Sequence, residues 1–258
     1  MAIQLQIIPT DLLEDFKQAI PENAFVNFEN LAESKLSTAT FDFYTSVSAV
    51  FSSKIEGEDI DLDSFIKHKK MGVQYQPDYT RKIDDLYEAY AFAQDNNLDE
   101  LGVNYAHTLI TRNILQETHR GKYRNSNMYV ITDDGKIDYV AADPQDIVKE
   151  IAKLYYDIKI LLDENLSFEE VLYFASMIHL VFVKIHPYED GNGRTARLLE
   201  KWFLAQKLGQ KAWYITSEKH YYENHQLYYR NIRTLGIEYN ELDYSKALPF
   251  TLMLANGY

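Results

Sequence analysis

The 258-residue chain contains no cysteine, which excludes both a disulfide framework and a zinc site built on thiolates. It has only 10 glycines and 6 prolines, and no linker, repeat or low-complexity tract interrupts it. No apolar run reaches the ~18 residues that a membrane span requires. The N-terminus lacks the basic start of a secretory signal. We therefore expect a cytoplasmic protein without a membrane partner.

Positive charge is also scarce, because 39 acidic side chains face 26 basic ones and the formal net charge is −13. A field of this sign repels phosphate backbones, so we expect no nucleic-acid partner. Any site for an anionic ligand must then supply its own positive potential. The segment 186–197 stands out in this respect, since it places two arginines beside an amide-rich turn.

Apolar residues recur mostly at helical spacing, which predicts a mainly α-helical protein. One helix is expected over about 38–56, where an apolar stripe ends just before Gly57. Ser167 and Glu170 form the pattern of a capping box for a helix over 168–185. Further helices are expected over 81–97, 100–117, Asp143-Pro144 to about Leu162, 193–207, about 217–234 and 244–255.

The segment NMYVITDDGKIDYVAA breaks the helical pattern. Two apolar runs flank Asp134-Gly135, and a glycine that accepts positive φ there predicts a β-hairpin. A single exposed hairpin is only marginally stable, so it must pack on the helical body or clamp another chain.

The densest chemistry lies in HPYEDGNGRTAR, residues 186–197. Pro187 ends the preceding helix and favours an extended conformation at His186. The next helix is expected to begin near Gly193, so that its free amides point out of the turn. Gly191 and Gly193 let a ligand approach the backbone. Such a turn can form an anion-binding nest, which predicts a phosphate seat.

The side chains around this turn complement a bound phosphate. Arg194 and Arg197 share one helix face, and an anion between them would relieve their repulsion and their conflict with the helix dipole. Asp190 could hold a magnesium ion that bridges phosphate oxygens, and Asn192 adds a neutral donor or acceptor. His186 has an ordinary pKa near neutrality, which makes it the candidate general base.

Each of these residues also has an ordinary structural explanation. A histidine before a proline is commonly a cap or a core residue, and a DGNG sequence is commonly just a turn. Arg197 could pair with Glu200 as a surface ion pair. The convergence of all of them on one loop-to-helix junction favours a site.

HPYEDGNGRTAR resembles the signature HxFx[D/E]GNGRxxR of the Fic family, and it differs only at Tyr188, which replaces phenylalanine. The hydroxyl of Tyr188 would need a partner. GKYRNSNMYV, residues 121–130, is similar to the family's segment leading into its hairpin flap. The resemblance covers roughly residues 80–235 and implies a helical Fic-like core with a small β-hairpin flap.

The resemblance implies transfer of AMP from magnesium ATP to a hydroxyl of an unidentified target protein or of the enzyme itself. It makes His186 the base and Asp190 the magnesium ligand. It assigns the nucleotide contacts to Gly191, Asn192, Gly193, Arg194 and Arg197, with Asn192 on the α-phosphate, and to an aromatic cluster that includes Tyr221, Tyr222, Tyr228 and Tyr229. Tyr222 and Tyr229 are our candidates for the adenine contact. The hairpin residues Tyr129, Val130 and Ile131 would dock the target as an added strand.

SSKIEG, residues 52–57, matches the family's inhibitory motif [S/T]xxxE[G/N] and precedes the signature. Ser52 and Glu56 lie one turn apart on a helix, and Gly57 follows as its cap. The resemblance implies that Glu56 pairs with Arg197, occupies the γ-phosphate position and leaves ATP out of line for attack. A solvated glutamate before a cap is the alternative.

We expect three regions: an N-terminal helical region with the inhibitory helix (1–79), the Fic-like core (80–235) and a C-terminal helical extension packed on it (236–258). Residues 1–37 and 236–258 carry no motif, and either packing on the core or self-association into a homodimer stays open for them. Three alternatives to AMP transfer stay open as well. They are phosphotransfer on the same loop, removal of AMP by water with Glu56 as the activating base, and a nucleotide-binding regulatory protein without turnover.

Overall fold

The computed structural model describes residues 4–38, 42–75, 77–131, 135 and 137–257. This part of the chain is mainly helical with a small two-stranded sheet, so the expected fold class is confirmed. The helices are α1 (Leu13–Ala19), α2 (Ala24–Glu29), α3 (Phe43–Ile55), α4 (Leu62–Met71), α5 (Pro77–Asp95), α6 (Glu100–Ile110), α7 (Ile147–Asp163), α8 (Phe168–Ile185), α9 (Asn192–Leu208), α10 (Ser217–Glu223), α11 (His225–Arg233) and α12 (Leu248–Ala255).

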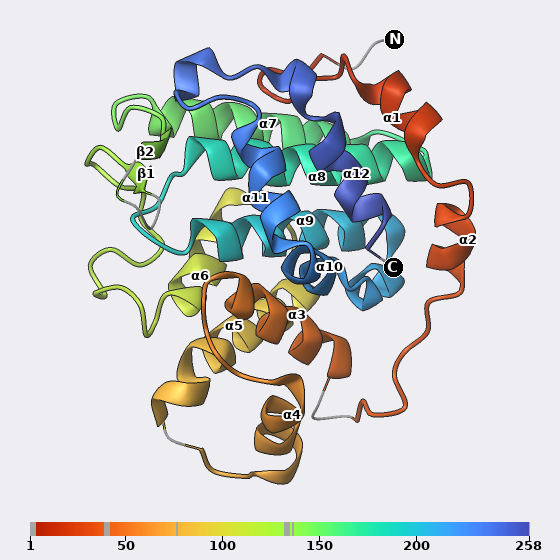
Figure 1. The fold of residues 1–258 in the computed structure, drawn as a ribbon, viewed down its shortest axis with the longest axis vertical. Helices are drawn as coiled ribbons and strands as arrows, with labels where there is room; N and C mark the ends of the chain where they lie inside the picture. Colours follow the sequence, from red (N-terminus) through yellow and green to blue (C-terminus); the bar gives the residue numbers. More distant parts are fainter. Residues whose placement is uncertain (1–3, 39–41, 76, 132–134, 136, 258) are drawn as a thin grey trace.

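Helices α8 and α9 form the centre of the molecule. Figure 1 shows α7, α8 and α9 side by side, with α12 and α1 packed against α8. Helices α3, α5 and α6 contact α9. Nearly every side chain of α8 is buried, as expected of a helix that is apolar on all sides. The loop between the two central helices is residues 186–191, so the signature segment is held between rigid elements.

The ends of α8 and α9 follow the sequence closely. The hydroxyl of Ser167 accepts a hydrogen bond from the Glu170 amide, and the Glu170 carboxylate accepts one from the Ser167 amide, which completes the predicted capping box. Helix α9 begins one residue earlier than predicted, after Gly191 with φ +78°, and it ends at Leu208, which is followed by the capping Gly209 with φ +80°. Both glycines adopt a backbone conformation that other residues rarely adopt.

Two predicted helix boundaries are wrong because side-chain hydrogen bonds intervene, local ones at the first boundary and bonds between distant residues at the second. Asp143 accepts from the Gln145 amide and closes a tight turn, so α7 begins at Ile147. Helix α6 ends at Ile110 rather than at residue 117, since the chain turns there and Asn113 donates twice to Asp85.

Two other helices are shorter than expected. The Asp42 carboxylate accepts from the Thr45 amide and caps α3, which therefore begins at Phe43 and not at 38. Residues 39–41 of the expected helix lie outside the described part. The helix expected over 217–234 is divided at Asn224 into α10 and α11.

The predicted hairpin is present as β1 (Tyr129–Ile131) and β2 (Ile137–Val140), paired antiparallel with an irregularity between Val130 and Ile131. Gly135 has φ +79°, as the turn requires, whereas Asp134 lies outside the described residues. The hairpin is attached to the body at β2. The Tyr139 hydroxyl donates to the Lys184 carbonyl of α8 at 2.6 Å, and the Val140 amide donates to the Ile237 carbonyl at 2.8 Å.

Both terminal regions pack on the central helices. The buried Asp157 carboxylate of α7 accepts hydrogen bonds from the amides of residues 6, 7 and 8. Helix α12 lies against α8 and α11. The borders at 79 and 235 stay predictions. Within the described residues, none of the helices combines the length and apolar character needed to cross a bilayer.

Candidate functional site

A cavity of about 310 Å³ brings together predicted residues from four separate stretches of the chain. It lies between the end of α3, the hairpin, the start of α9 and the helix α11. Its lining residues are Glu56, Met128, Tyr129, Val130, Asp138, Tyr139, Val183, Lys184, His186, Gly193, Arg197, Tyr228, Tyr229, Ile232 and Arg233. A larger hollow of about 570 Å³ lies along residues 4–11 and contains none of the predicted site residues, so its size alone does not identify a site.

His186 terminates α8 in a left-handed conformation, with φ 53° and ψ 59°, so the extended conformation predicted for it is wrong. Its amide still donates to the Phe182 carbonyl, and this last helical bond forces the chain to turn before Pro187. The imidazole Nδ1 lies 3.2 Å from the Val183 carbonyl. In the neutral ring Nδ1 therefore carries the proton, which leaves Nε2 as the proton acceptor.

The imidazole of His186 is neutral at physiological pH. Burial lowers its pKa to about 4, and the nearby Arg124 guanidinium acts in the same direction. The carboxylates of Glu56 and Asp190 oppose this shift without overcoming it. A neutral imidazole with an unprotonated nitrogen is the form that a general base requires.

Two glycines at the start of α9 let neighbouring side chains lie against its backbone. A Cβ at Gly191 would lie 2.8 Å from the Thr111 methyl carbon. A Cβ at Gly193 would lie 2.5 Å from Glu56 Oε1. Glycine at these two positions therefore lets Thr111 and the Glu56 carboxylate lie close to the backbone at the start of α9.

Asn192 and Tyr188 close the signature loop on itself. Asn192 Oδ1 accepts from the Tyr188 amide at 2.9 Å, and Asn192 Nδ2 donates to the Tyr188 carbonyl at 2.8 Å. The Tyr188 hydroxyl donates to Asn104 Oδ1 at 2.5 Å, which is the partner that its replacement of phenylalanine requires. Asn192 thus has a structural role, and its contact with an α-phosphate stays a prediction.

His107 of α6 fixes the other end of this loop and was not predicted. Its ring stacks on Tyr188 with centroids 3.6 Å apart, and its Nε2 donates to the Asp190 carbonyl at 2.9 Å. Its Nδ1 accepts from the Gly121 amide. Burial lowers the pKa of His107 to about 4, so the ring stays neutral and keeps this arrangement. Asp190 itself is exposed at the rim, where its carboxylate accepts from the Gly191 amide at 2.5 Å.

Arg197 is buried and its guanidinium is held by α3. Its Nε donates to the Ser52 hydroxyl at 2.8 Å, and its Nη2 donates to the Ser52 carbonyl at 3.0 Å and to Glu56 Oε1 at 2.6 Å. The alternative pairing with Glu200 is wrong, because Glu200 is itself buried and bonds to His179 and Tyr221. The Glu56–Arg197 contact that the resemblance implies is therefore present, and Ser52, for which no such contact was predicted, bonds to the same guanidinium.

Glu56 is an ionised carboxylate beside the start of α9. Burial disfavours its charge, but the attraction of Arg197 and then of Arg194 outweighs burial and holds the pKa of Glu56 below its usual value. It follows the last residue of α3, and Gly57, with φ +89°, turns the chain away behind it. The Glu56 carboxylate lies directly beside Gly193 at the N-terminus of α9.

Arg194 is the second buried cation of the site. Its Nη2 lies 3.8 Å from Glu58, whose carboxylate is bonded more closely to Lys82 at 2.7 Å. The Nε of Arg194 is buried and has no hydrogen-bond partner in the described part of the chain. A buried donor of this kind is energetically unfavourable unless a ligand satisfies it.

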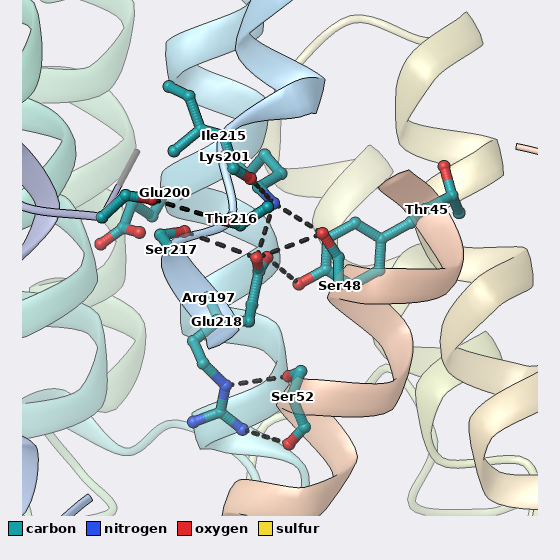
Figure 2. A network of polar contacts seen from close by, with 12 residues as sticks. Thr45, Ser48, Ser52, Arg197, Glu200, Lys201, Ile215, Thr216, Ser217 and Glu218 are labelled. Carbon is teal, nitrogen blue, oxygen red and sulfur yellow. Dashed lines mark hydrogen bonds and ion pairs between the residues drawn. The ribbon is translucent and has the colours of Figure 1, made fainter. Parts of the chain in front are cut away.

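A second buried network anchors α3 to the site (Figure 2). Lys201 of α9 donates to Ser48 of α3 at 2.6 Å, to Glu218 of α10 at 2.6 Å and to the Ile215 carbonyl at 2.7 Å. The Tyr90 hydroxyl completes it by donating to the other oxygen of Glu218 at 2.8 Å. Because this charge pair is fully bonded inside the protein, it fixes the position of α3 without an unsatisfied charge.

The four tyrosines of the aromatic cluster have different surroundings. Tyr229 lines the cavity. Tyr222 is not among the lining residues, and it packs on Phe51 and beside Lys54 of α3. Tyr221 is fully buried, and Tyr228 bonds to both His179 and Arg197. Tyr229, but not Tyr222, thus lines the same cavity as two other predicted nucleotide contacts, Gly193 and Arg197, whereas Gly191, Asn192 and Arg194 are not among its lining residues.

The hairpin forms one wall of the cavity through Tyr129 and Val130, while Ile131 is exposed. Lys184, which was not predicted, lies beneath it. Its ammonium is 4.1 Å from the Tyr139 ring and 3.3 Å from the Gly236 carbonyl. Burial lowers the pKa of Lys184 to about 8.

Residues 97–204 match the Fic/DOC family. The curated "Protein adenylyltransferase Fic" of Nematostella vectensis is 36% identical over 93 residues, which are 35% of this chain and 20% of that protein. "Protein adenylyltransferase fic-1" of Caenorhabditis briggsae is 37% identical over 79 residues, 31% of this chain and 14% of that protein. The matches therefore span a fifth or less of the length of these relatives.

Solved structures confirm the fold over nearly the whole chain. A Fic family protein from Desulfovibrio desulfuricans has a TM-score of 0.76 at 21% identity and covers 99% of this chain and 75% of its own. A Fic domain containing signaling protein from Bacteroides thetaiotaomicron has a TM-score of 0.66 at 17% identity, and the match covers 95% of this chain and 89% of that protein's chain. Fic-1 from C. elegans has a TM-score of 0.65 at 16% identity, and the match covers 95% of this chain and 68% of the Fic-1 chain.

Proposed function

The chain is a Fic-domain protein, and from that premise we propose that it is an autoinhibited protein adenylyltransferase. It transfers AMP from magnesium ATP to a hydroxyl side chain of a target protein or of itself. One observation carries the proposal. The neutral His186 lines the same cavity as Gly193 at the N-terminus of α9 and the buried Arg197, and an internal carboxylate, that of Glu56, is bonded to this arginine beside the helix start.

The phosphate seat follows from the N-terminus of α9. The Glu56 carboxylate lies beside Gly193 at the N-terminus of α9, where the helix dipole favours negative charge. Arg197 and the unsatisfied Nε of Arg194 add two buried cations. A triphosphate that replaced Glu56 would find charge-assisted donors already oriented.

Asp190 is the residue that would hold magnesium. Its exposed carboxylate lies beside the seat, and magnesium in nucleotide sites is commonly held by one or two carboxylates together with the substrate phosphates. Bound there, the ion would neutralise charge on the phosphates. The rest of the site is supplied by this chain's own residues.

In the proposed reaction Nε2 of His186 takes the proton of the attacking hydroxyl. The hydroxyl oxygen forms a bond to the α-phosphorus, and the bond from that phosphorus to the bridging oxygen breaks, so that pyrophosphate leaves with the electron pair. Arg197 and Arg194 stabilise the charge that develops on the leaving group. The Tyr129–Ile131 strand would hold the target's backbone beside His186.

The resting state is the inhibited one. Glu56 bonds to Arg197 at 2.6 Å and occupies the end of the seat, so a nucleotide that enters must either displace it or bind with a misplaced triphosphate. The support for this part of the proposal is the geometry of Ser52 and Glu56, which both bond to the same guanidinium.

The experiment compares Glu56→Gly with the double variant Glu56→Gly/His186→Ala, using ATP labelled on the α-phosphate. We expect incorporation into protein by the single variant, loss of at least about 100-fold in the double variant, and ATP binding within about twofold in both. His220→Ala in the same background is the matched control, because His220 does not line the cavity. Unchanged incorporation in the double variant would remove His186 as the base. If the modified protein gains the mass of a phosphate instead of that of AMP, the reaction is phosphotransfer and not AMP transfer.

A further inference from the structure

Arg124 connects the hairpin to the histidine loop through a single buried guanidinium. Its Nε donates to the carbonyl of His186 at 2.8 Å. Its Nη1 donates to the carbonyl of Ser126 at 2.6 Å, just before β1, and its Nη2 donates to that of Ala142 at 2.5 Å, just after β2. The backbone amide of Arg124 adds a bond to the Pro187 carbonyl at 2.9 Å.

These partners make Arg124 an unusual buried cation. The side-chain hydrogen bonds that the structure records for it all go to backbone carbonyls, and only 4% of the residue is exposed. Burial lowers the pKa of its guanidinium, which reflects the cost of keeping this charge inside the protein. A planar fork with fixed donor directions ties its partners to one another, which the single ammonium of a lysine cannot do.

The first partner is the strained point of the site. His186 has φ 53°, which is uncommon for a residue with a side chain. Its amide is fixed by Phe182, its ring by Val183 and its carbonyl by Arg124. Surrounding bonds have to hold such a conformation in place, and Arg124 supplies the one that does not come from α8.

The other two partners are the two ends of the hairpin. Ser126 and Ala142 lie where the chain enters and leaves the β-structure, and one guanidinium sets the distance between them. The attachment of Tyr139 to Lys184 holds the hairpin to α8 at a separate point. The guanidinium of Arg124 thus bonds both to the hairpin ends and to the carbonyl of His186.

We propose that Arg124 is a positioning residue that holds the hairpin and the His186 imidazole in one fixed geometry, so that a hydroxyl docked along β1 meets Nε2. The inference rests on the proposed function and adds a residue that acts through His186 and the hairpin without touching the nucleotide. A loose hairpin or a rotated imidazole would misalign the attack, and misplacement by about 1 Å can reduce a rate 100-fold.

The test uses Arg124→Lys and Arg124→Met in the full chain carrying Glu56→Gly. We expect kcat for AMP transfer to fall about tenfold or more and KM for the acceptor to rise, with the Kd of ATP unchanged within about twofold. Arg120→Lys and Arg120→Met are the matched controls, because Arg120 lies on the same segment and its Nε donates to a single local carbonyl, that of Leu115. We expect the controls to retain the parent kcat.

Two further measurements do not depend on activity. The ring nitrogen shifts of ¹⁵N-labelled His186 report whether Nδ1 alone carries the proton, and hydrogen exchange reports the stability of the Tyr139–Val140 amides. We expect both to change in Arg124→Lys and neither to change in Arg120→Lys. Tyr139→Phe leaves Arg124 in place, so it should speed exchange in the hairpin without altering the His186 ring.

The proposal is overturned if folded Arg124→Lys keeps the parent ring shifts and hairpin exchange. It is also overturned if Tyr139→Phe disturbs the His186 ring as much as Arg124→Lys does, because any hairpin attachment would then suffice. Should Glu56→Gly itself show no AMP transfer, the proposed function fails, while the ring shifts and the exchange rates still decide the role of Arg124.

Discussion

Arg197 Nη2 donates to Glu56 Oε1 at 2.6 Å, and this bond joins the start of α9 to the end of α3 across the cavity. The arginine side chain is 1% exposed, whereas the glutamate side chain is 26% exposed. The cation is thus permanently in place, while its partner sits at the cavity wall where a ligand can compete with it. Leaving the buried Arg197 without a partner is destabilising, and a triphosphate is a suitable substitute for Glu56.

Ser52→Ala should release the inhibition in part. The substitution leaves the buried Nε of Arg197 without its acceptor at 2.8 Å, while the bonds to the Ser52 carbonyl and to Glu56 remain. We expect the free energy of unfolding to fall by about 1–3 kcal/mol. AMP transfer should rise above wild type but stay below that of Glu56→Gly, as measured by incorporation of labelled AMP.

Ser53→Ala is the control for this substitution. The Ser53 hydroxyl is also buried but has no hydrogen-bond partner among the described residues. Removing this hydroxyl should leave the rate of AMP transfer unchanged. The free energy of unfolding should stay the same or rise slightly. Equal activation by the two alanines would show that the Ser52 hydroxyl does not hold the arginine.

The pH profile of Glu56→Gly should lack the inflection of an ordinary histidine. Burial lowers the pKa of His186 to about 4, and loss of the Glu56 charge, which raises it, can only lower it further. The base is then unprotonated throughout the neutral range. With saturating magnesium, kcat/KM should vary less than about twofold between about pH 5.5 and 7.5, whereas an unperturbed histidine would halve it near about pH 6.5.

Lys184 should make the free energy of unfolding depend on pH. Its pKa is about 8 in the folded protein against 10.5 as the ordinary value, so between these pH values the unfolded state binds more protons. Stability rises with pH wherever that holds. The free energy of unfolding of wild type minus that of Lys184→Met should therefore rise from pH 8 to 10.5 by up to about 3 kcal/mol. A flat difference in denaturant titrations would show that the ammonium is solvated.

The central helices and the candidate site could be predicted from local sequence patterns, because these patterns depend on residues within about one helical turn of each other. The capping box of Ser167 and Glu170 and the glycines at 191 and 209 fix helix ends through bonds to near neighbours. A local bond of the same kind makes the predicted helix N-cap at Asp143 wrong, because its carboxylate caps a turn before the helix.

The missed residues act through long-range contacts. His107 lies in no motif, and Arg124 lies in the family-like segment 121–130 without a role assigned to it. The importance of both lies in bonds to the Asp190 and His186 carbonyls in the loop between α8 and α9. The left-handed His186 was missed because the rule for a residue before proline ignores the helical bond to Phe182. The Glu56–Arg197 pair was predicted only because a family motif supplied the partner.

The most direct measurement is the rate of labelled AMP incorporation by purified Glu56→Gly compared with wild type, at equal ATP and magnesium. Glycine at position 56 ends α3 without changing the Ser48, Lys201 and Glu218 anchor, so the cavity should open while the fold stays intact. The account predicts a rise of at least about tenfold, since a charge-assisted contact worth more than about 1.4 kcal/mol is removed from the nucleotide's path. A folded variant that binds ATP but transfers AMP no faster than wild type would contradict it.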